Sequence, residues 1–412
     1  MLAFKRDNLP DRNYDIAIVG GGIIGLSTAM QLLEKFPRVK VGVLEKDREI
    51  ATQQTGHNSG VIHSGIYYRP GSFKARFCVD GRESMYRFCT ENGIKVVRCG
   101  KVIVATREDE LPRLQTLLER GTANGVPDLR MISPAELREV EPHAFAIRAL
   151  RAPHTAIVNY QDVSTAYARR IAACGGAVTT GARVHGIIRA NGRVVLETAA
   201  GSVEARNMIN CAGLHSDQIA RLSGTDPEVR IVPFRGEYYT LRKDRQHLVK
   251  GLIYPVPDPA FPFLGVHFTN NVKGYVEAGP NAVLAAAREG YRKLDLSVPD
   301  LWGTVSYGGF WRMAARDWRT GAMEFNRSAR KGVFVRDLRR LIPEITSADL
   351  DGGGSGVRAQ AVDRTGKLLD DFHIKASENA VHVLNAPSPG ATSSLVIGRY
   401  IVDMAARTFG LN

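Results

Sequence analysis

The sequence of 412 residues predicts an α/β protein, in which a doubly wound, mostly parallel sheet is interleaved with an α+β domain built on an antiparallel sheet. Three observations predict this fold class. A strand-turn-helix-strand pattern opens the chain, and buried strands return in the middle and near the end. Between them lie strand-like pieces separated by turns rich in Pro and Gly. The length also exceeds the ~250–300 residues at which single cores stop growing, so two domains, or one domain with a large insertion, are expected.

The opening pattern is that of a complete β-α-β unit. A β-branched, apolar run over 14–19 is typical of a buried parallel strand, and the helical stretch over 26–36 is ended by Pro37. A second buried run covers 39–44. Residues 16–33 carry no charge, but three consecutive glycines interrupt them, so a strand, a turn and a helix explain them better than a membrane span.

A glycine motif joins the first strand to the helix. Gly20, Gly22 and Gly25 have G-x-G-x-x-G spacing, and Glu45 follows the second strand twenty residues beyond the last glycine. Gly20 permits the tight turn, Gly22 lets a pyrophosphate approach the backbone, and Gly25 lets helix and strand pack closely. The phosphates would sit on the helix N-terminus, and Glu45 would accept hydrogen bonds from ribose hydroxyls. The motif in this context predicts a dinucleotide cofactor, either NAD or FAD.

Later segments predict the remaining strands of the two sheets. In chain order they are a hairpin over 181–197 that turns at Asn191-Gly192, a strand at 207–211 that enters the turn Ala212-Gly213, antiparallel strands over 230–277, and a strand at 381–384. The last strand leads through the turn at 385–394 into a helix that ends near residue 406. The free N–H groups at the start of that helix would suit a negatively charged group.

Composition and charge narrow the functional classes. Apolar residues make up 44% and charged residues 24%, which excludes disorder, collagen and coiled coil. The formal charge of +13 suits nucleic acid, an anionic membrane surface or an acidic substrate, and does not choose among them. Five scattered cysteines without a C-x-x-C pair predict neither a zinc site nor a disulfide scaffold, and favour a reducing compartment. Since the N-terminus lacks the apolar core of a signal peptide, a cytoplasmic protein is expected.

Six blocks of sequence, in order along almost the whole chain, resemble one family. They are QTGHNSGVIHSGIYY at 54–68, PFRGEY at 233–238, FLGVH at 263–267, GPNAVL at 279–284, GVRAQ at 356–360 and NAPSP at 385–389. With them the chain resembles the L-2-hydroxyglutarate dehydrogenase/oxidase family, within the D-amino-acid oxidase-like superfamily of FAD enzymes. Two positions depart from the family pattern: Ala286-Ala287 replaces an aromatic-basic pair, and Gly390 replaces the usual alanine.

The resemblance implies a Rossmann-type FAD-binding domain over 1–88, 150–222 and 345–412, and a substrate or cap domain over 89–149 and 223–344. It implies non-covalent FAD and the oxidation of L-2-hydroxyglutarate to 2-oxoglutarate, in which the C2 hydride passes to flavin N5. Besides Gly20, Gly22, Gly25 and Glu45, the implied cofactor residues are Ile23, Lys46, Thr55, Asn58, Ser59, Val184, Ala212, Gly213, Pro389, Gly390, Ala391 and Thr392.

Oxidation of a 2-hydroxy acid on a flavin requires a base for the hydroxyl proton and cations for the carboxylates. His63 and His57 are the main candidates for the base, because histidine transfers protons near neutral pH. We expect His63 to act as base or substrate contact and His57 to neighbour the flavin, and His267 competes with them. A structural role in the core is the alternative for each.

Candidate substrate residues lie near the return of the chain to the cofactor domain. Arg358 follows a predicted glycine-rich turn at 352–356, and its guanidinium would grip a carboxylate in a bidentate manner. Gln360, two residues further on, shares its face if the segment is a strand. Tyr239 and Arg235 are secondary candidates by the family resemblance.

Other functions fit part of the sequence. An amino-acid oxidase of the same superfamily would share the cofactor residues and differ in the substrate pocket, and a glycerol-3-phosphate-type dehydrogenase is a further alternative. A basic nucleic-acid-binding flavoprotein would use the positive charge, but the sequence has no helix-turn-helix and no aromatic-interleaved basic ribbon. We therefore expect no nucleic-acid partner.

One segment is unusually basic. Residues 311–340 hold nine basic and three acidic side chains. Arg312, Arg316 and Arg319 have the spacing of one helix face, and Trp311 and Trp318 are also seven apart. Such a helix would lie on an anionic membrane surface, as a peripheral enzyme that passes electrons to quinone requires. The alternative is a solvated outer face of the substrate domain, with oxygen as the electron acceptor.

Overall fold

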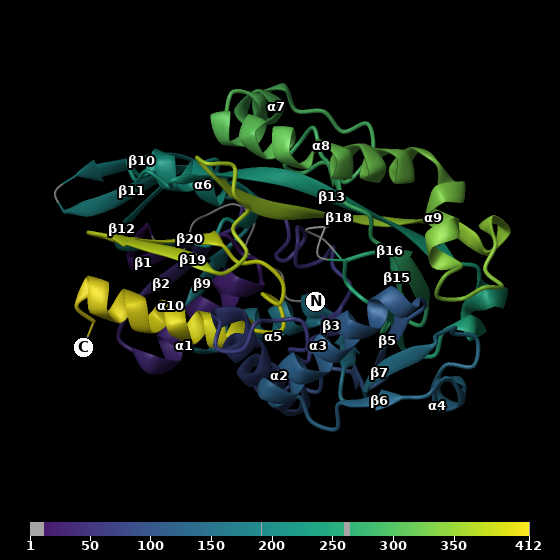
Figure 1. Ribbon diagram of the computed structural model, residues 1–412. Helices are drawn as coiled ribbons and strands as arrows, with labels where there is room; N and C mark the ends of the chain where they lie inside the picture. Colours follow the sequence, from purple (N-terminus) through teal and green to yellow (C-terminus); the bar gives the residue numbers. More distant parts are fainter. Residues whose placement is uncertain (1–11, 191, 259–263, 412) are drawn as a thin grey trace.

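The computed structural model describes residues 12–190, 192–258 and 264–411. The N-terminal stretch without a predicted signal sequence, Asn191 of the predicted hairpin turn and Phe263 of the FLGVH block lie outside the described residues. Figure 1 shows two large sheets, one toward each end of the molecule, with helices packed around them. The predicted α/β fold class is confirmed by this architecture.

The first sheet contains the predicted nucleotide-binding strands. Its order is β10-β11-β12-β1-β2-β9, and β20 pairs with β12 and β19. The strands are β1 (Asn13–Val19), β2 (Val41–Leu44), β9 (Ala177–Thr179), β10 (Val184–Ala190), β11 (Arg193–Thr198), β12 (Gly201–Asn210), β19 (His373–Ser377) and β20 (Ala380–Asn385). The strands β1, β2, β9, β12 and β20 are parallel to one another, and β10-β11-β12 form an antiparallel meander.

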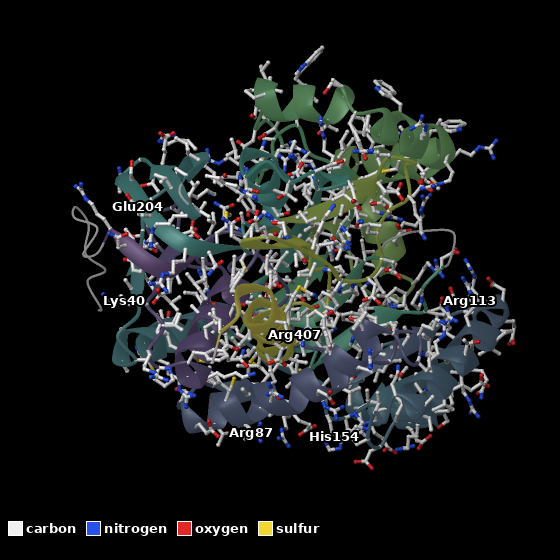
Figure 2. All side chains as sticks on the ribbon, turned by 90° about the vertical axis from the view of Figure 1, so that its left-hand side faces the viewer. Lys40, Arg87, Arg113, His154, Glu204 and Arg407 are labelled. Atoms are coloured by element: carbon white, nitrogen blue, oxygen red, sulfur yellow. The ribbon has the colours of Figure 1, made fainter. Side chains whose placement is uncertain are left out.

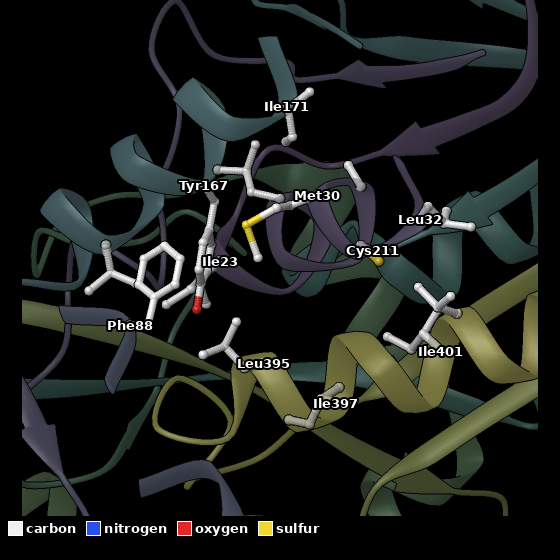
Figure 3. Close-up of a cluster of buried hydrophobic side chains, with 14 of the residues drawn as sticks. Ile23, Met30, Leu32, Phe88, Tyr167, Ile171, Cys211, Leu395, Ile397 and Ile401 are labelled. Carbon is white, nitrogen blue, oxygen red and sulfur yellow. The ribbon is translucent and has the colours of Figure 1, made fainter. Parts of the chain in front are cut away.

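The opening β-α-β unit is confirmed, with the helix α1 (Ile23–Lys35) between β1 and β2. Side chains of β1 alternate between two cores, because successive residues of a strand point to opposite faces. Ile16 and Ile18 pack with α1, α5 (Tyr160–Ala173) and α10 (Ser394–Phe409), whereas Ala17 and Val19 join the core on the other face. Figure 3 shows this first core, in which Leu395, Ile397 and Ile401 of α10 lie against α1. The predicted C-terminal helix therefore covers the nucleotide-binding sheet.

The second sheet is almost wholly antiparallel. Its order is β17-β13-β16-β15-β14-β5-β7-β6, and β18 pairs with β13 along nearly its whole length. The strands are β5 (Lys101–Ala105), β6 (Arg130–Ile132), β7 (Arg148–Ala152), β13 (Val229–Leu241), β14 (Leu252–Pro255), β15 (His267–Asn270), β16 (Val276–Gly279), β17 (Val283–Leu284) and β18 (Leu350–Asp363). Only the pair β14-β5 is parallel among the described strands of this sheet. The antiparallel strands predicted over 230–277 are thus confirmed.

Two local predictions are corrected. The glycine run at 352–356 forms no turn and lies inside β18. Glycine is needed there because the backbone is crowded: a Cβ on Gly353 would lie 2.5 Å from the carbonyl oxygen of Tyr238. The basic segment is not one regular helix. The helix α8 (Gly308–Ala329) is interrupted at Asp317, where φ is −108° and ψ is 15°, and α9 (Lys331–Leu338) follows it.

The remaining elements surround the two sheets. They are α2 (Phe73–Glu91), α3 (Leu111–Ala123), α4 (Pro134–Val140), α6 (Ser216–Leu222), α7 (Val298–Val305), four 3₁₀ turns, and a small sheet of β3 (Val61–Ile62), β8 (Ala156–Val158) and β4 (Val96–Val97). Figure 1 shows α7 and α8 as a layer over β13 and β18. In the described part of the chain, no helix combines the length and apolar character that a membrane span requires. The domain boundaries stay a prediction; β18, which lies beyond residue 345, pairs with β13 in the second sheet.

Candidate functional site

A cavity of about 960 Å³ opens between the two sheets. It is lined by most of the residues that the sequence singled out: Gly20, Gly22, Ile23, Glu45, Lys46, Thr55, His57, Asn58, Ser59, His63, Val184, Ala212, Gly213, His267, Arg358, Gln360, Pro389, Gly390, Ala391 and Thr392. Gly25, Arg235 and Tyr239 do not line it. The fold therefore brings most of the predicted cofactor and substrate residues to one continuous chamber.

The glycine turn after β1 forms a cradle that a side chain would fill. Gly20 has φ +113°, and a Cβ on it would lie 2.4 Å from the carbonyl oxygen of Cys211. A Cβ on Gly25 would lie only 2.1 Å from the carbonyl oxygen of Gly20, so Gly25 acts through close packing beneath the turn. At the start of α1, Gly22 supplies no side-chain cap, and the backbone N–H of Ile23 donates to Thr55 Oγ1 over 3.1 Å. This N-terminus at the cavity wall fits a pyrophosphate.

Glu45 lies at the end of β2 and fixes the turn. Its Oε2 accepts a hydrogen bond from the Gly21 N–H over 2.7 Å, and its Oε1 accepts one from the Asp47 N–H over 2.9 Å. Burial raises its pKa, and the two N–H donors oppose that shift. Since each carboxylate oxygen can accept a second hydrogen bond, Glu45 retains acceptors for ribose hydroxyls.

The loop after β2 is organised by its own polar side chains. The Asn58 amide donates to the Thr55 carbonyl over 2.6 Å, and its Oδ1 accepts the Gly60 N–H over 2.8 Å. Lys46 is held by Asp47 at 2.7 Å and by Glu289 at 2.9 Å. Asn58 and Lys46 thus shape the cavity wall through contacts within the protein.

His57 lies where this loop meets the second sheet. Its ring stacks on Tyr291, with centroids 4.1 Å apart, and its Nδ1 lies 2.8 Å from the Ser355 carbonyl oxygen of β18. A Cβ on Gly356 would lie 2.5 Å from the His57 carbonyl oxygen, so the glycine run of β18 permits this approach. Because a carbonyl only accepts hydrogen bonds, His57 Nδ1 carries a proton.

The turn before α10 reaches the same chamber. Thr392 Oγ1 accepts a hydrogen bond from the His63 N–H over 3.1 Å and lies 3.0 Å from the Tyr160 hydroxyl. The helix that follows, α10, begins at Ser394 without a side-chain cap. Its first N–H, that of Ser394, donates to the Ala391 carbonyl over 3.2 Å, and the role of this helix end in binding a negatively charged group stays a prediction.

His63 and His267 are both neutral imidazoles. Burial is the main cause that lowers the pKa of each to about 3, and the charge of Lys101 adds to it. His267 is stacked on Tyr254 with centroids 3.8 Å apart, and its Nδ1 lies 2.8 Å from the Gly265 carbonyl oxygen. Since Nδ1 must donate to that carbonyl, His267 Nε2 carries the lone pair. His63 Nε2 lies 3.5 Å from the Ser388 hydroxyl. Both rings can accept a proton.

Arg358 reaches the cavity from β18, where it lies opposite Phe234 in register. The surrounding protein lowers its pKa by desolvation, and the phenols of Tyr238 and Tyr254 oppose that shift. A guanidinium stays charged in any case. The Gln360 amide, on the same face, donates to the carbonyls of Ala361 and Leu369 at 3.1 and 3.2 Å.

The alternation of β13 explains why two predicted residues lie outside the cavity. Gly236 and Tyr238 face it, so Arg235 and Tyr239 face away. Arg235 is buried against Glu237, with Nη2 2.9 Å from Oε1, and the Tyr239 ring packs on Phe334 at 4.9 Å.

Among the residues at the chamber, three tyrosines and one lysine were not predicted from the sequence. Tyr67, Tyr238 and Tyr254 line it, and Lys101 lies behind the rings of Tyr67 and Tyr254. The motif HSGIYY contains Tyr67, but no spacing rule connects it to β5 or β14. The alternation around Arg235 was the available signal for Tyr238.

Comparison with known proteins adds a family context. A model of the family "FAD dependent oxidoreductase" matches residues 15–404. The chain is 49% identical to "L-2-hydroxyglutarate dehydrogenase" of Indibacter alkaliphilus, covering 96% of this chain and 100% of that protein. It is 44% identical to the mitochondrial enzyme of the same name from Homo sapiens, covering 97% of this chain and 90% of that protein.

Solved structures share the fold at lower sequence identity. An L-alpha-glycerophosphate oxidase of Mycoplasma pneumoniae, solved with FAD bound, superimposes with a TM-score of 0.78 at 22% identity, covering 98% of this chain and 96% of that one. A glycine oxidase of Geobacillus kaustophilus superimposes with a TM-score of 0.70 at 18% identity, covering 96% and 95%.

Proposed function

The chain belongs to the family of FAD-dependent oxidoreductases that includes the L-2-hydroxyglutarate dehydrogenases, and from this we propose that it oxidises L-2-hydroxyglutarate to 2-oxoglutarate. The observation that best supports this proposal is that the glycine cradle, two neutral histidines and Arg358 all line one chamber. The alternative of an amino-acid oxidase has less support, because the relatives at 49% and 44% identity are named as dehydrogenases of a hydroxy acid.

FAD fits the cradle at Gly20 and the N-terminus of α1, and when bound it supplies the acceptor for the C2 hydride. Glu45 would hold the adenosine ribose, and the N-terminus of α10 would face the flavin O2/N1 edge. Arg358 holds one substrate carboxylate. His63 takes the hydroxyl proton, and His267, with its lone pair on Nε2, is the competing base. His57, which contacts Ser355 and Tyr291 at the chamber wall, would neighbour the flavin.

An anaerobic titration tests this proposal. L-2-hydroxyglutarate should bleach the flavin absorbance with one equivalent per chain, while the D-enantiomer and L-amino acids should leave it unchanged. Acid precipitation should leave a colourless pellet, since we propose that the FAD is non-covalent. Bleaching by amino acids and not by the hydroxy acid would replace this function with that of an amino-acid oxidase.

The value of kcat/KM should depend little on pH below neutrality. A base with the ordinary histidine pKa near 6.5 would be about tenfold less available at pH 5.5 than at pH 8. With the pKa of His63 and His267 lowered to about 3, the neutral form predominates throughout this range, so kcat/KM should change less than twofold between pH 5.5 and 7. A tenfold fall centred near pH 6.5 would contradict a base in this environment.

We also propose that the enzyme docks on an anionic membrane surface and passes electrons to quinone. Large apolar side chains are exposed on the stretch that contains α7 and α8, which we call the 294–325 face: Leu294, Leu296, Val298, Trp302, Trp311, Trp318, Met323 and Phe325. Leu294, Trp302 and Phe325 are 94%, 69% and 71% exposed. Figure 1 shows these helices as an outer layer, and Figure 2 shows side chains that project from this layer away from the body. Exposed aromatic groups beside basic ones are typical of interfacial helices.

The arginines contribute less to this face than the sequence suggested. Arg312 donates to the Arg364 carbonyl, and Arg316 pairs with Asp317 at 2.8 Å. Arg319 lies over the Trp318 ring at 5.5 Å. The kink at Asp317 also breaks their common helix face. Apolar insertion would therefore carry more of the binding than charge, and the salt dependence should be moderate.

Sedimentation with anionic liposomes tests the docking. The wild type should pellet with the vesicles at low salt and partly at high salt. A Trp302→Ser/Trp318→Ser/Phe325→Ser variant should lose most of this binding, and an Arg312→Glu/Arg316→Glu/Arg319→Glu variant should lose part of it. Phe145→Ser, which removes an exposed aromatic group elsewhere, is the matched control. Wild type that stays in the supernatant at low salt would contradict docking and leave oxygen or a soluble carrier as the acceptor.

A further inference from the structure

Lys101, at the start of β5, is a cation enclosed by protein behind the chamber wall. The residue is only 3% exposed. Its Nζ lies 4.0 Å from the ring centroid of Tyr254 and 5.0 Å from that of Tyr67, and both tyrosines line the cavity. Across residues 12–190, 192–258 and 264–411, its electrostatic neighbours are the thiols of Cys78 and Cys99, and no acidic side chain pairs with it. Burying a charge without a counter-ion is costly, so such a cation calls for a functional explanation.

The neighbours of Lys101 supply no negative charge either. The titratable groups around it are Cys78 and Cys99, Tyr67 and Tyr254, and His63 and His267. Burial raises the pKa of the two thiols to about 12 and about 11, and raises the pKa of both phenols. All of these groups are therefore neutral near pH 7. The two tyrosine rings stabilise the ammonium through their π faces, without neutralising it.

The two cations whose charge acts on His267 lie on different strands of the second sheet. Arg358 is on β18, and Lys101 is on β5. In the strand order, β13, β16, β15 and β14 lie between them, with His267 on β15 and Tyr254 on β14. A substrate at His267 would thus have one positive charge on either side of it.

We propose that Lys101 is a positioning residue that selects dicarboxylates: acting across the rings of Tyr67 and Tyr254, its charge attracts the substrate carboxylate that Arg358 does not hold. This inference rests on the proposed function, whose substrate is a dianion. In an enclosed site of low dielectric, such an attraction is screened far less than at the surface. Two cations match two carboxylates, whereas a monocarboxylate would need only Arg358.

The proposal has a consequence for pH. Burial lowers the pKa of Lys101 to about 7, so the ammonium predominates below pH 7 and is lost above it. Because a bound dianion favours the charged form, binding above pH 7 must take up a proton. The dissociation constant of a dicarboxylate should then rise by up to tenfold per pH unit above 7, while that of a monocarboxylate should not follow it.

The experiment measures ligand binding to the oxidised holoenzyme through the change in flavin absorbance. Glutarate and butyrate, which differ by one carboxylate, are titrated at pH 6 and pH 9. At pH 6, Lys101→Met should weaken glutarate about ten- to a hundredfold and butyrate less than threefold. The wild type should lose most of its glutarate preference at pH 9, and Lys101→Arg should keep it, since guanidinium stays charged. Lys35→Met, which removes an exposed lysine paired with Asp403, should match the wild type.

Stability separates this role from a structural one. Since no acidic side chain in the described part of the chain pairs with Lys101, Lys101→Met should keep or raise the melting temperature at pH 6. A Lys101→Met enzyme that folds and retains the wild-type glutarate preference would overturn the proposal, and so would a wild type that binds both ligands equally at pH 6. If L-2-hydroxyglutarate fails to bleach the wild-type flavin, the proposed function itself fails, which is a different outcome.

Discussion

An Arg358→Ala enzyme is expected to lose about 2–4 kcal/mol of transition-state stabilisation, which corresponds to a fall of about 30- to 1000-fold in kcat/KM for L-2-hydroxyglutarate. Arg358 faces the cavity from β18, next to the phenols of Tyr238 and Tyr254. Its removal would leave a substrate carboxylate without its bidentate donor in an enclosed chamber. Steady-state kinetics with the flavin-loaded variant measures the effect.

Two variants sharpen this test. Arg358→Lys keeps the charge but not the forked geometry, so it should fall between wild type and alanine. Arg364→Ala removes an exposed arginine just beyond the same strand, where it pairs with Asp226, and should leave the kinetics unchanged. Near-normal kinetics for Arg358→Ala would place the carboxylate elsewhere in the chamber.

Gly25→Ala is expected to give a protein that neither holds FAD nor folds stably, with a loss of about 3 kcal/mol or more. The added Cβ would lie 2.1 Å from the carbonyl oxygen of Gly20 and 3.3 Å from Cys211 Cβ. Gly20 directly follows β1 and Cys211 directly follows β12, so neither can move without displacing the end of its strand. The measurements are the flavin content per chain and the free energy of unfolding.

Gly321→Ala is the matched control, since Gly321 also lies in a helix and an added Cβ meets nothing within 4 Å. It should stabilise the protein by about 0.5–1 kcal/mol, because alanine is the better helix former. A Gly25→Ala protein with full flavin content would show that the turn can relax around the added methyl group, and that close packing at this position does not require glycine.

The nucleotide-binding part of the fold was predictable because its determinants are local. The glycine spacing, the apolar runs around it and Glu45 all lie within one stretch of about thirty residues, and the structure places them as expected. The glycine run at 352–356 was misjudged for the opposite reason. Glycine there serves the close approach of β18 to Tyr238 and His57, which come from distant segments.

The substrate side of the site was harder to predict, because the sequence does not reveal which alternate residues of a strand face the cavity. Both faces of β13 are covered, so Arg235 and Tyr239 on one side and Tyr238 on the other look alike in the sequence. Lys101 reads as an ordinary exposed lysine before an apolar strand, and only the assembled fold encloses it between Tyr67 and Tyr254. The kink at Asp317 was likewise hidden in a continuous helical pattern.

The position of β20 and α10 sets the order in which the protein can mature. A ribosome completes β1, α1 and β2 early, whereas β20, which pairs with β12, and the turn that binds His63 through Thr392 follow the whole second sheet in the chain. Until these segments emerge, the chamber lacks one wall and α1 lacks the cover that Leu395 and Ile397 provide. The cofactor site is therefore completed late in synthesis, and the apolar face of the first sheet stays partly uncovered until then.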